Sequence, residues 1–333
     1  MPNPRWHPLV RSVLFLIAFI LVQGVATALV AVAGMLSTFR GTHYDPLGAT
    51  YLLVFALTAP PLVFVTKVFV RHLDRCDLAS LGIRWPDGGR RRALRQALTV
   101  PVVTLALVAA WAILVALLGD LHFDRLSDGF QRGPSWLPGP LGSGVLLVLI
   151  LLGFLIQGGI EEWVMRGYIY RALKERWPWW VSALVSAGLF SALHALNPDV
   201  SGVALFNIVL AGVLLAELVE RSGSLWSATI AHGVWNFAIA CLLSLPISGV
   251  PFFRVFDASI SGPGLVTGGA FGPEGSLLLS ALALVLIALL WPRRPAAVPA
   301  LPGQTDQPDP IDQAEDPTRS TILPNTDSRP SVP

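Results

Sequence analysis

The sequence predicts an all-α fold, a polytopic membrane bundle of about eight transmembrane helices with both termini in the cytoplasm. Of the 333 residues, 53% are hydrophobic and only 13% are charged, whereas a soluble domain carries about 25% charged residues. Eight apolar segments are long enough, or nearly so, to cross a hydrocarbon core of about 30 Å. These segments are 12–37, 49–70, 97–119, 144–170, 181–197, 202–219, 225–245 and 275–292.

The first apolar segment is longer than the apolar region of a signal peptide, which has about 7–15 residues, so we expect an uncleaved first helix. Basic residues set the predicted orientation, because Arg and Lys gather on the cytoplasmic side. With the N-terminus inside, the outer loops hold only Arg40, Arg125, Arg132 and Arg254. The inner segments hold Arg5, Arg11, Arg71, Arg75, Arg84, Arg90, Arg91, Arg92, Arg95, Arg171, Lys174, Arg176, Arg221, Arg293 and Arg294.

The pattern divides the chain into four regions. Residues 1–143 hold the first three helices and a basic cytoplasmic loop at 71–96, and residues 144–245 hold the next four helices. Residues 246–294 hold an outer loop and the last helix. Residues 295–333 are rich in Pro, Asp, Gln, Thr and Ser, which predicts a disordered cytoplasmic tail.

Charge and cysteine content exclude two kinds of site. The net charge of +2 gives no reason to expect a nucleic-acid partner, so the expected surroundings are the lipid bilayer and membrane-associated molecules. The two cysteines, Cys76 and Cys241, cannot form a disulfide framework, and the chain has no CxxC zinc pattern.

Three charged residues, Glu161, Glu162 and Arg166, lie within the fourth apolar segment. A charge near the bilayer centre costs roughly 3 kcal/mol, so their presence favours a functional role. Glu162 and Arg166 are four residues apart, in the favourable order for an ion pair on one helix face. Glu161 has no such partner on its own helix, and an unpaired buried carboxylate suits a general base. The structural alternatives are a salt-bridge network, or a helix that ends near Glu161.

Two histidines lie in later apolar segments. His194 follows Phe190 by one turn inside the fifth segment, where a lone histidine is also compatible with simple packing. His232 and Asn236 share one face of the seventh segment and offer two hydrogen-bond donors that could hold a developing oxyanion. The structural alternative for that pair is an interhelical polar contact. Two further buried polar residues that could support the site are Gln157 and Asn207.

In order along the chain, Glu-Glu-x-x-x-Arg, Phe-x-x-x-His and His-x-x-x-Asn resemble the motifs of the CPBP family. This family comprises the type II CAAX prenyl endopeptidases and their bacterial relatives, and it is also called the Abi family. The resemblance covers about residues 144–245, and its specificity comes from the combination of the three motifs. The matching residues are Glu161, Glu162, Arg166, Phe190, His194, His232 and Asn236.

The resemblance implies an eight-helix intramembrane bundle that hydrolyses a peptide bond. By the family pattern, Glu161 and His194 would activate a water, and His232 and Asn236 would stabilise the tetrahedral oxyanion. The supporting residues would be Glu162 and Arg166.

The family is often classed among the metallopeptidases. Glu161, His194 and His232 could hold a divalent metal such as zinc, because carboxylate and imidazole groups are zinc ligands. The same residues also fit a glutamate mechanism without a metal, so both remain open.

We therefore expect a hydrolase of the CAAX protease type in the inner (plasma) membrane of a bacterial cell. Its substrate would be a membrane-associated peptide or protein, either prenylated and CAAX-like or a bacteriocin-type peptide. One alternative is a non-catalytic immunity or scaffold protein of the same fold. Another is an ion- or proton-coupled transporter, although the sequence lacks the internal repeats that favour one.

Overall fold

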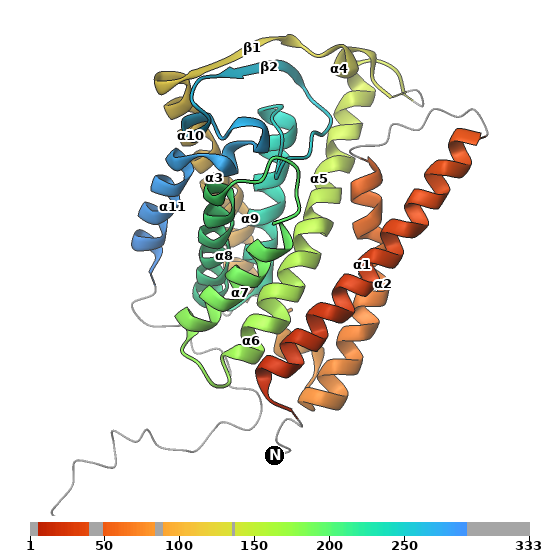
Figure 1. The fold of residues 1–333 in the computed structure, drawn as a ribbon, viewed down its shortest axis with the longest axis vertical. Helices are drawn as coiled ribbons and strands as arrows, with labels where there is room; N and C mark the ends of the chain where they lie inside the picture. Colours follow the sequence, from red (N-terminus) through yellow and green to blue (C-terminus); the bar gives the residue numbers. More distant parts are fainter. Residues whose placement is uncertain (1–5, 40–48, 84–88, 135–136, 292–333) are drawn as a thin grey trace, which may run out of the picture. The chain divides into compact units, whose positions relative to one another are not determined.

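Eight apolar helices dominate the computed structural model of the protein, one for each apolar segment of the sequence (Figure 1). The structure describes residues 6–39, 49–83, 89–134 and 137–291. The predicted tail at 295–333 and residues 84–88 of the basic loop lie outside these ranges. The eight helices are α1 (Pro8–Phe39), α2 (Ala49–Phe69), α3 (Gly89–Leu118), α5 (Pro140–Glu162), α7 (Trp179–Leu193), α8 (Gly202–Ser222), α9 (Leu225–Phe237) and α11 (Leu277–Leu290).

Several shorter elements extend or connect these helices. Wider, π-helical turns follow three of them, at Val70–Asp74, Trp163–Ile169 and Ala238–Leu242. The short α-helices are α4 (Asp128–Arg132), α6 (Tyr170–Leu173) and α10 (Gly264–Thr267), and the 3-10 turns are Leu78–Leu81, Gly269–Phe271 and Pro273–Gly275.

Six of the described helices are long and apolar enough to cross a membrane, and α7 and α11 are shorter. Outward-facing apolar side chains such as Leu21, Phe64 and Leu117 are more than 60% exposed, as expected for a surface in contact with lipid. The predicted fold class, a polytopic helical membrane protein, is confirmed. The number of crossings and the side on which each terminus lies stay predictions.

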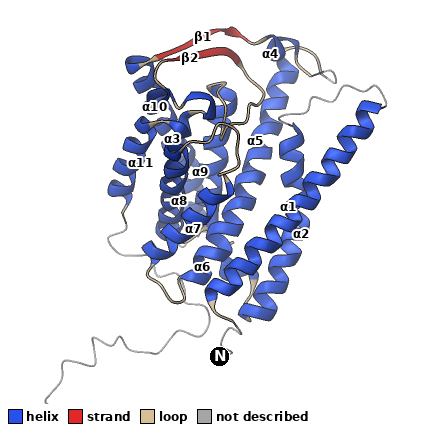
Figure 2. Cartoon of the chain, in the orientation of Figure 1, coloured by secondary structure: helices blue, strands red, loops and turns tan. Residues whose placement is uncertain are grey.

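The described residues also form a two-stranded antiparallel sheet (Figure 2). It pairs β1 (Asp120–Leu126), which follows α3, with β2 (Phe256–Ser261), which precedes α10. Both strands fall in segments that the sequence assigned to outer loops. The register pairs Leu121 with Ile260, and an irregularity separates Phe123 from Arg125.

The contact between α5 and α9 brings the site residues of the two helices together. α5 packs against both α9 and α2, and α7 packs against α8. The α5–α9 contact is close because glycines lie on both sides of it. A Cβ added at Gly158 would lie 3.2 Å from the Cβ of His232, and one at Gly233 would lie 2.9 Å from the Cα of Leu155.

A buried ion-pair cluster joins three segments at the predicted cytoplasmic end of the bundle. Arg11 of α1 is fully buried and its guanidinium pairs with Asp74, at the end of the turn after α2, and with Glu175, after α6. Its Nε also donates to the carbonyl of Trp6 at 3.0 Å. The guanidinium therefore holds the start of α1 against both connections.

Candidate active site

The two adjacent glutamates close α5, and the helix widens immediately after them. Glu162 is fully buried, and its Oε1 accepts a hydrogen bond from Nη1 of Arg166 at 3.0 Å, as the four-residue spacing predicts. Arg166 lies in the π-helical segment Trp163–Ile169. Such wide turns are rare and occur frequently at functional sites.

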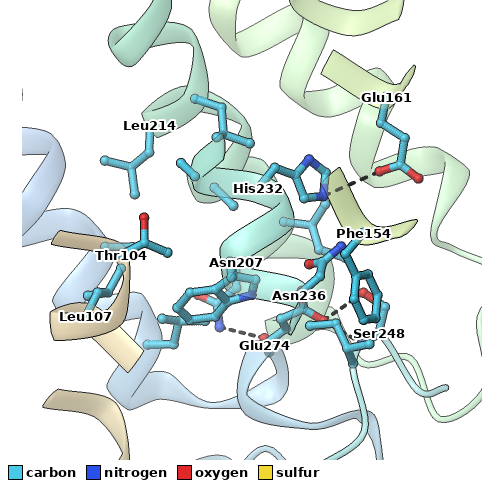
Figure 3. A pocket seen from close by; sticks show the side chains of 18 of the residues that line it. Thr104, Leu107, Phe154, Glu161, Asn207, Leu214, His232, Asn236, Ser248 and Glu274 are labelled. Atoms are coloured by element: carbon cyan, nitrogen blue, oxygen red, sulfur yellow. Dashed lines mark hydrogen bonds and ion pairs between the residues drawn. The ribbon is translucent and has the colours of Figure 1, made fainter. Parts of the chain in front are cut away.

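His232 lies between the two carboxylates. Its Nδ1 is 2.9 Å from Oε1 of Glu162, which is a hydrogen bond that the imidazole donates to the carboxylate. Its Nε2 is 3.5 Å from Oε2 of Glu161 (Figure 3), which is longer than a normal hydrogen bond. That Oε2 is buried and has no hydrogen-bond partner in the described part of the chain. The polar face between Glu161 and His232 is thus unsatisfied by the protein itself.

A second polar contact joins the same two helices one turn away. Gln157 precedes Glu161 by four residues on α5, and Asn236 follows His232 by four on α9, so the antiparallel helices place the two pairs opposite each other. Nδ2 of Asn236 donates to Oε1 of Gln157 at 2.8 Å. This bond fixes the amide and leaves one N–H of Asn236 for another acceptor.

His194 does not lie inside the fifth helix, as the sequence indicated, but directly after its end. α7 ends at Leu193, and the N–H of His194 bonds to the carbonyl of Ser191 in a tighter turn. The apolar residues Ala195 and Leu196 favour a longer helix. Pro198, however, cannot continue a helix and disfavours a helical conformation at the residue before it. Nδ1 of His194 lies 2.9 Å from the carbonyl of Phe190 and must donate, because a carbonyl only accepts. Its Nε2 is therefore the nitrogen with a free lone pair.

Phe190 contacts three of the polar site residues at once, a role that its place in the sequence did not reveal. The cationic carbon of Arg166 lies 5.0 Å from the centre of its ring. The rings of His194 and His232 lie 4.7 Å and 5.9 Å from it, both edge-on. The phenylalanine therefore packs the arginine and both imidazoles against one rigid surface.

All four predicted catalytic residues line one cavity of about 350 Å³. Figure 3 shows three of them, Glu161, His232 and Asn236. Small-molecule sites have volumes of roughly 300–1,000 Å³, so the space suits a short peptide segment or a lipid chain. Its walls come from α3, α5, α7, α8, α9 and α11 and from the segments around 194–197, 247–252 and 274. The four residues are Glu161, His194, His232 and Asn236.

Comparison with protein families identifies the part of the chain that holds these residues. Residues 143–238 match the family model described as Rce1-like, type II CAAX prenyl endopeptidase. The family resemblance is confirmed. The match includes every motif residue from Glu161 to Asn236, and it leaves out the first three helices and the last one. No curated protein and no solved structure matches the chain.

A third acidic residue, Glu274, borders the cavity from outside the Rce1-like segment, and the sequence gave no reason to select it. Oε2 of Glu274 accepts hydrogen bonds from the N–H and the hydroxyl of Ser248, at 2.8 Å and 2.7 Å. Burial raises the pKa of this carboxyl, while the Ser248 bonds and the imidazoles of His194 and His232 oppose that shift. The residue lies in the 3-10 turn Pro273–Gly275, just before α11.

Asn207 proves to be an interhelical contact. Its Nδ2 donates to the carbonyls of Glu274 and Ser276, both at 2.8 Å, and its Oδ1 accepts from the hydroxyl of Ser280 at 2.7 Å. Its side chain therefore holds α11, which lies outside the Rce1-like segment, to α8, which lies within it.

The described residues hold no group of three or more His, Cys, Asp or Glu side chains arranged to bind a metal ion. As they stand, Glu161, His194 and His232 do not form such a group, although Glu161 and His232 face each other. The predicted zinc stays a prediction.

Proposed function

We propose that the protein is an intramembrane endopeptidase that hydrolyses a peptide bond of a membrane-associated substrate. The observation that carries the proposal is the Glu161 carboxylate, whose buried Oε2 has no hydrogen-bond partner in the described chain and faces Nε2 of His232 at 3.5 Å in a cavity. A carboxylate held in this way is available to a water molecule. The substrate would be prenylated and CAAX-like or a bacteriocin-type peptide, at the inner membrane of a bacterial cell.

In the proposed reaction Glu161 is the general base. It takes a proton from a water whose oxygen attacks the scissile carbonyl carbon, and a new C–O bond forms as the carbonyl oxygen becomes an oxyanion. The free lone pair on Nε2 of His194 accepts the second hydrogen of that water and orients it. Glu161 then passes its proton to the leaving nitrogen, the C–N bond breaks, and the two peptide products separate.

The oxyanion would be stabilised by donors from α9. Asn236 retains one N–H beyond its bond to Gln157. His232 donates its Nδ1–H to Glu162, and in its protonated form it presents a second N–H at Nε2. Removing one such donor from an enzyme typically lowers turnover about 10²- to 10³-fold. Arg166 balances the charge of Glu162 and acts as a positioning residue.

The experiment compares new protein termini in membranes from cells that express the wild type, Glu161→Gln or Glu217→Gln at equal levels. Glu217 is a matched control, because it is a fully buried glutamate of α8 that does not line the cavity. We expect termini that appear with the wild type and with Glu217→Gln and vanish with Glu161→Gln. Identical termini with all three inserted proteins would refute proteolysis by this site and favour the scaffold.

A metal at Glu161, His194 and His232 is a separate proposal. Metal analysis of the purified chain tests it, with one zinc per wild-type chain and none in His194→Ala as the expected result.

A further inference from the structure

A basic pocket lies beside the cavity, where α3 begins and α8 ends. None of the described residues that line it is acidic. Guanidinium groups are planar forks of donors that match the oxygens of a phosphate. The polar residues of the basic pocket include Arg91, Arg92, Arg95, Arg221, Ser222 and Ser227.

The basic pocket and the cavity share a wall, since Thr99, Val100 and Leu218 line both. One face of α3 runs through the two spaces, from Arg91 to Leu107. Along it, side chains at four-residue steps change from arginine to threonine and then to valine and leucine. The stretch rises about 24 Å at 1.5 Å per residue, which exceeds the roughly 15 Å of one leaflet of the hydrocarbon core.

The apolar part of the cavity leads from this pocket to the candidate active site. Figure 3 shows Thr104, Leu107 and Leu214 on one side of the cavity and Glu161 and His232 on the other. The combined space is thus charged at one end and apolar along its length. This polarity matches a molecule with an anionic head and a hydrocarbon chain.

We propose that the basic pocket and the cavity together bind one anionic phospholipid. Its phosphate lies among the arginines, and one acyl chain lies along α3 toward His232. A solvated cytoplasmic loop accounts for the arginines alone, but it does not account for the apolar wall that continues from them. The predicted orientation places the basic pocket at the cytoplasmic leaflet, whose lipids are anionic.

Lipid binding does not require that the protein be a protease. If both proposals hold, the acyl chain occupies space that a substrate must enter, so the lipid and the substrate compete.

Native mass spectrometry of the full chain in a neutral detergent tests the proposal. The probes are dioleoylphosphatidylglycerol, dioleoylphosphatidylcholine, glycerophosphoglycerol, which has the head group without chains, and inorganic phosphate. The pocket variant is Arg91→Gln/Arg95→Gln. Its matched control is Arg71→Gln/Arg90→Gln, which removes the same charge from exposed positions that do not line the pocket. A third variant, Ala211→Phe, fills the cavity from an exposed position on α8.

We expect one phosphatidylglycerol per wild-type chain and an affinity about thirtyfold lower in the pocket variant, since each arginine near an anionic lipid contributes about fivefold. The control should stay within about twofold of the wild type, and Ala211→Phe should lose the lipid. Arg95→Gln alone, with a loss of about fivefold, replaces the double variant if that protein does not fold.

Three results would overturn the proposal. Equal retention of phosphatidylcholine would exclude recognition of an anionic head, and equal losses in the pocket variant and its control would indicate general surface charge. Equal binding of inorganic phosphate or glycerophosphoglycerol would identify a phosphate site without a chain site.

Discussion

The buried pair of Glu162 and Arg166 offers the sharpest test of how the candidate active site is held together. Both side chains are fully buried, and Oε1 of Glu162 accepts from both Arg166 and His232. Glu162→Gln keeps the shape of the side chain and removes its charge. Loss of one partner of a buried ion pair costs about 3–5 kcal/mol. We expect about 3 kcal/mol, the lower end, because the Glu161 carboxylate still interacts with Arg166.

A double-mutant cycle with Arg166→Met separates the pair from its surroundings. Arg166→Met should cost a similar amount, since it leaves Glu162 buried with only the imidazole as a partner. The double variant removes both charges, so it should cost less than the sum of the single variants by about 2–3 kcal/mol. Reversible denaturant unfolding in one fixed mixed micelle measures all four proteins. Additive losses would refute the view that the two charges act as a pair.

Proteolysis should respond differently from stability. The double variant recovers much of the folded state but still lacks the carboxylate that holds Nδ1 of His232, so it should remain inactive. Cleavage at the wild-type rate by the double variant would show that Glu162 serves the fold alone.

Four further predictions follow from other contacts. Gly233→Val should force α9 away from α5, lower stability by about 1–3 kcal/mol as overpacking does, and lower cleavage further than the unfolded fraction explains. Phe190→Leu should cost about 1–2 kcal/mol through the lost ring contact with the buried guanidinium, and should reduce turnover in the fraction that remains folded. Arg11→Met should lower the free energy of unfolding by about 3 kcal/mol, because two carboxylates lose their partner, and an unchanged denaturation midpoint would contradict the buried cluster. Burial and nearby carboxylates raise the pKa of the Cys76 thiol. In a Cys241→Ala background, maleimide should therefore label Cys76 more slowly than free cysteine near pH 7.5, and labelling should accelerate as the pH rises above 9. A labelling rate that is already maximal at pH 7.5 would exclude a raised pKa.

The features that the sequence predicts well are local ones. Each of the eight helices follows an apolar run, and the Glu162–Arg166 pair follows from a four-residue spacing. The prediction that His194 lies inside a helix was wrong. The end of α7 depends on a competition between apolar packing, which favours a longer helix, and Pro198, which does not allow one. Composition alone does not resolve that competition.

The remaining features depend on contacts between segments that are distant in the chain. The approach of His232 to both glutamates requires the close contact between α5 and α9. The glycines that allow this contact, Gly158 and Gly233, lie 75 residues apart in the sequence. The pairing of β1 with β2 joins two loops that are separated in the sequence by α5, α7, α8 and α9. Glu274 is held at the cavity wall by residues distant in the chain, since Asn207 donates to its backbone carbonyl and Ser248 donates to its carboxylate. Nothing in a single sequence specifies which of many polar residues meet in this way.

The small sheet constrains how the cavity can widen. It links the end of α3 to the segment that leads into α11, and Nε1 of Trp111 also donates to the Ser276 hydroxyl that caps α11, at 2.8 Å. α3 and α11, two of the helices that border the cavity, are therefore held together at the end where the sheet lies. At the other end the two helices are joined through the end of α8, since Nη2 of Arg92 donates to the carbonyl of Arg221 at 3.1 Å and Nη1 of Arg221 donates to the carbonyl of Leu290 at 2.7 Å. A widening of the cavity between α3 and α11 therefore has to break hydrogen bonds at one end of these helices or the other.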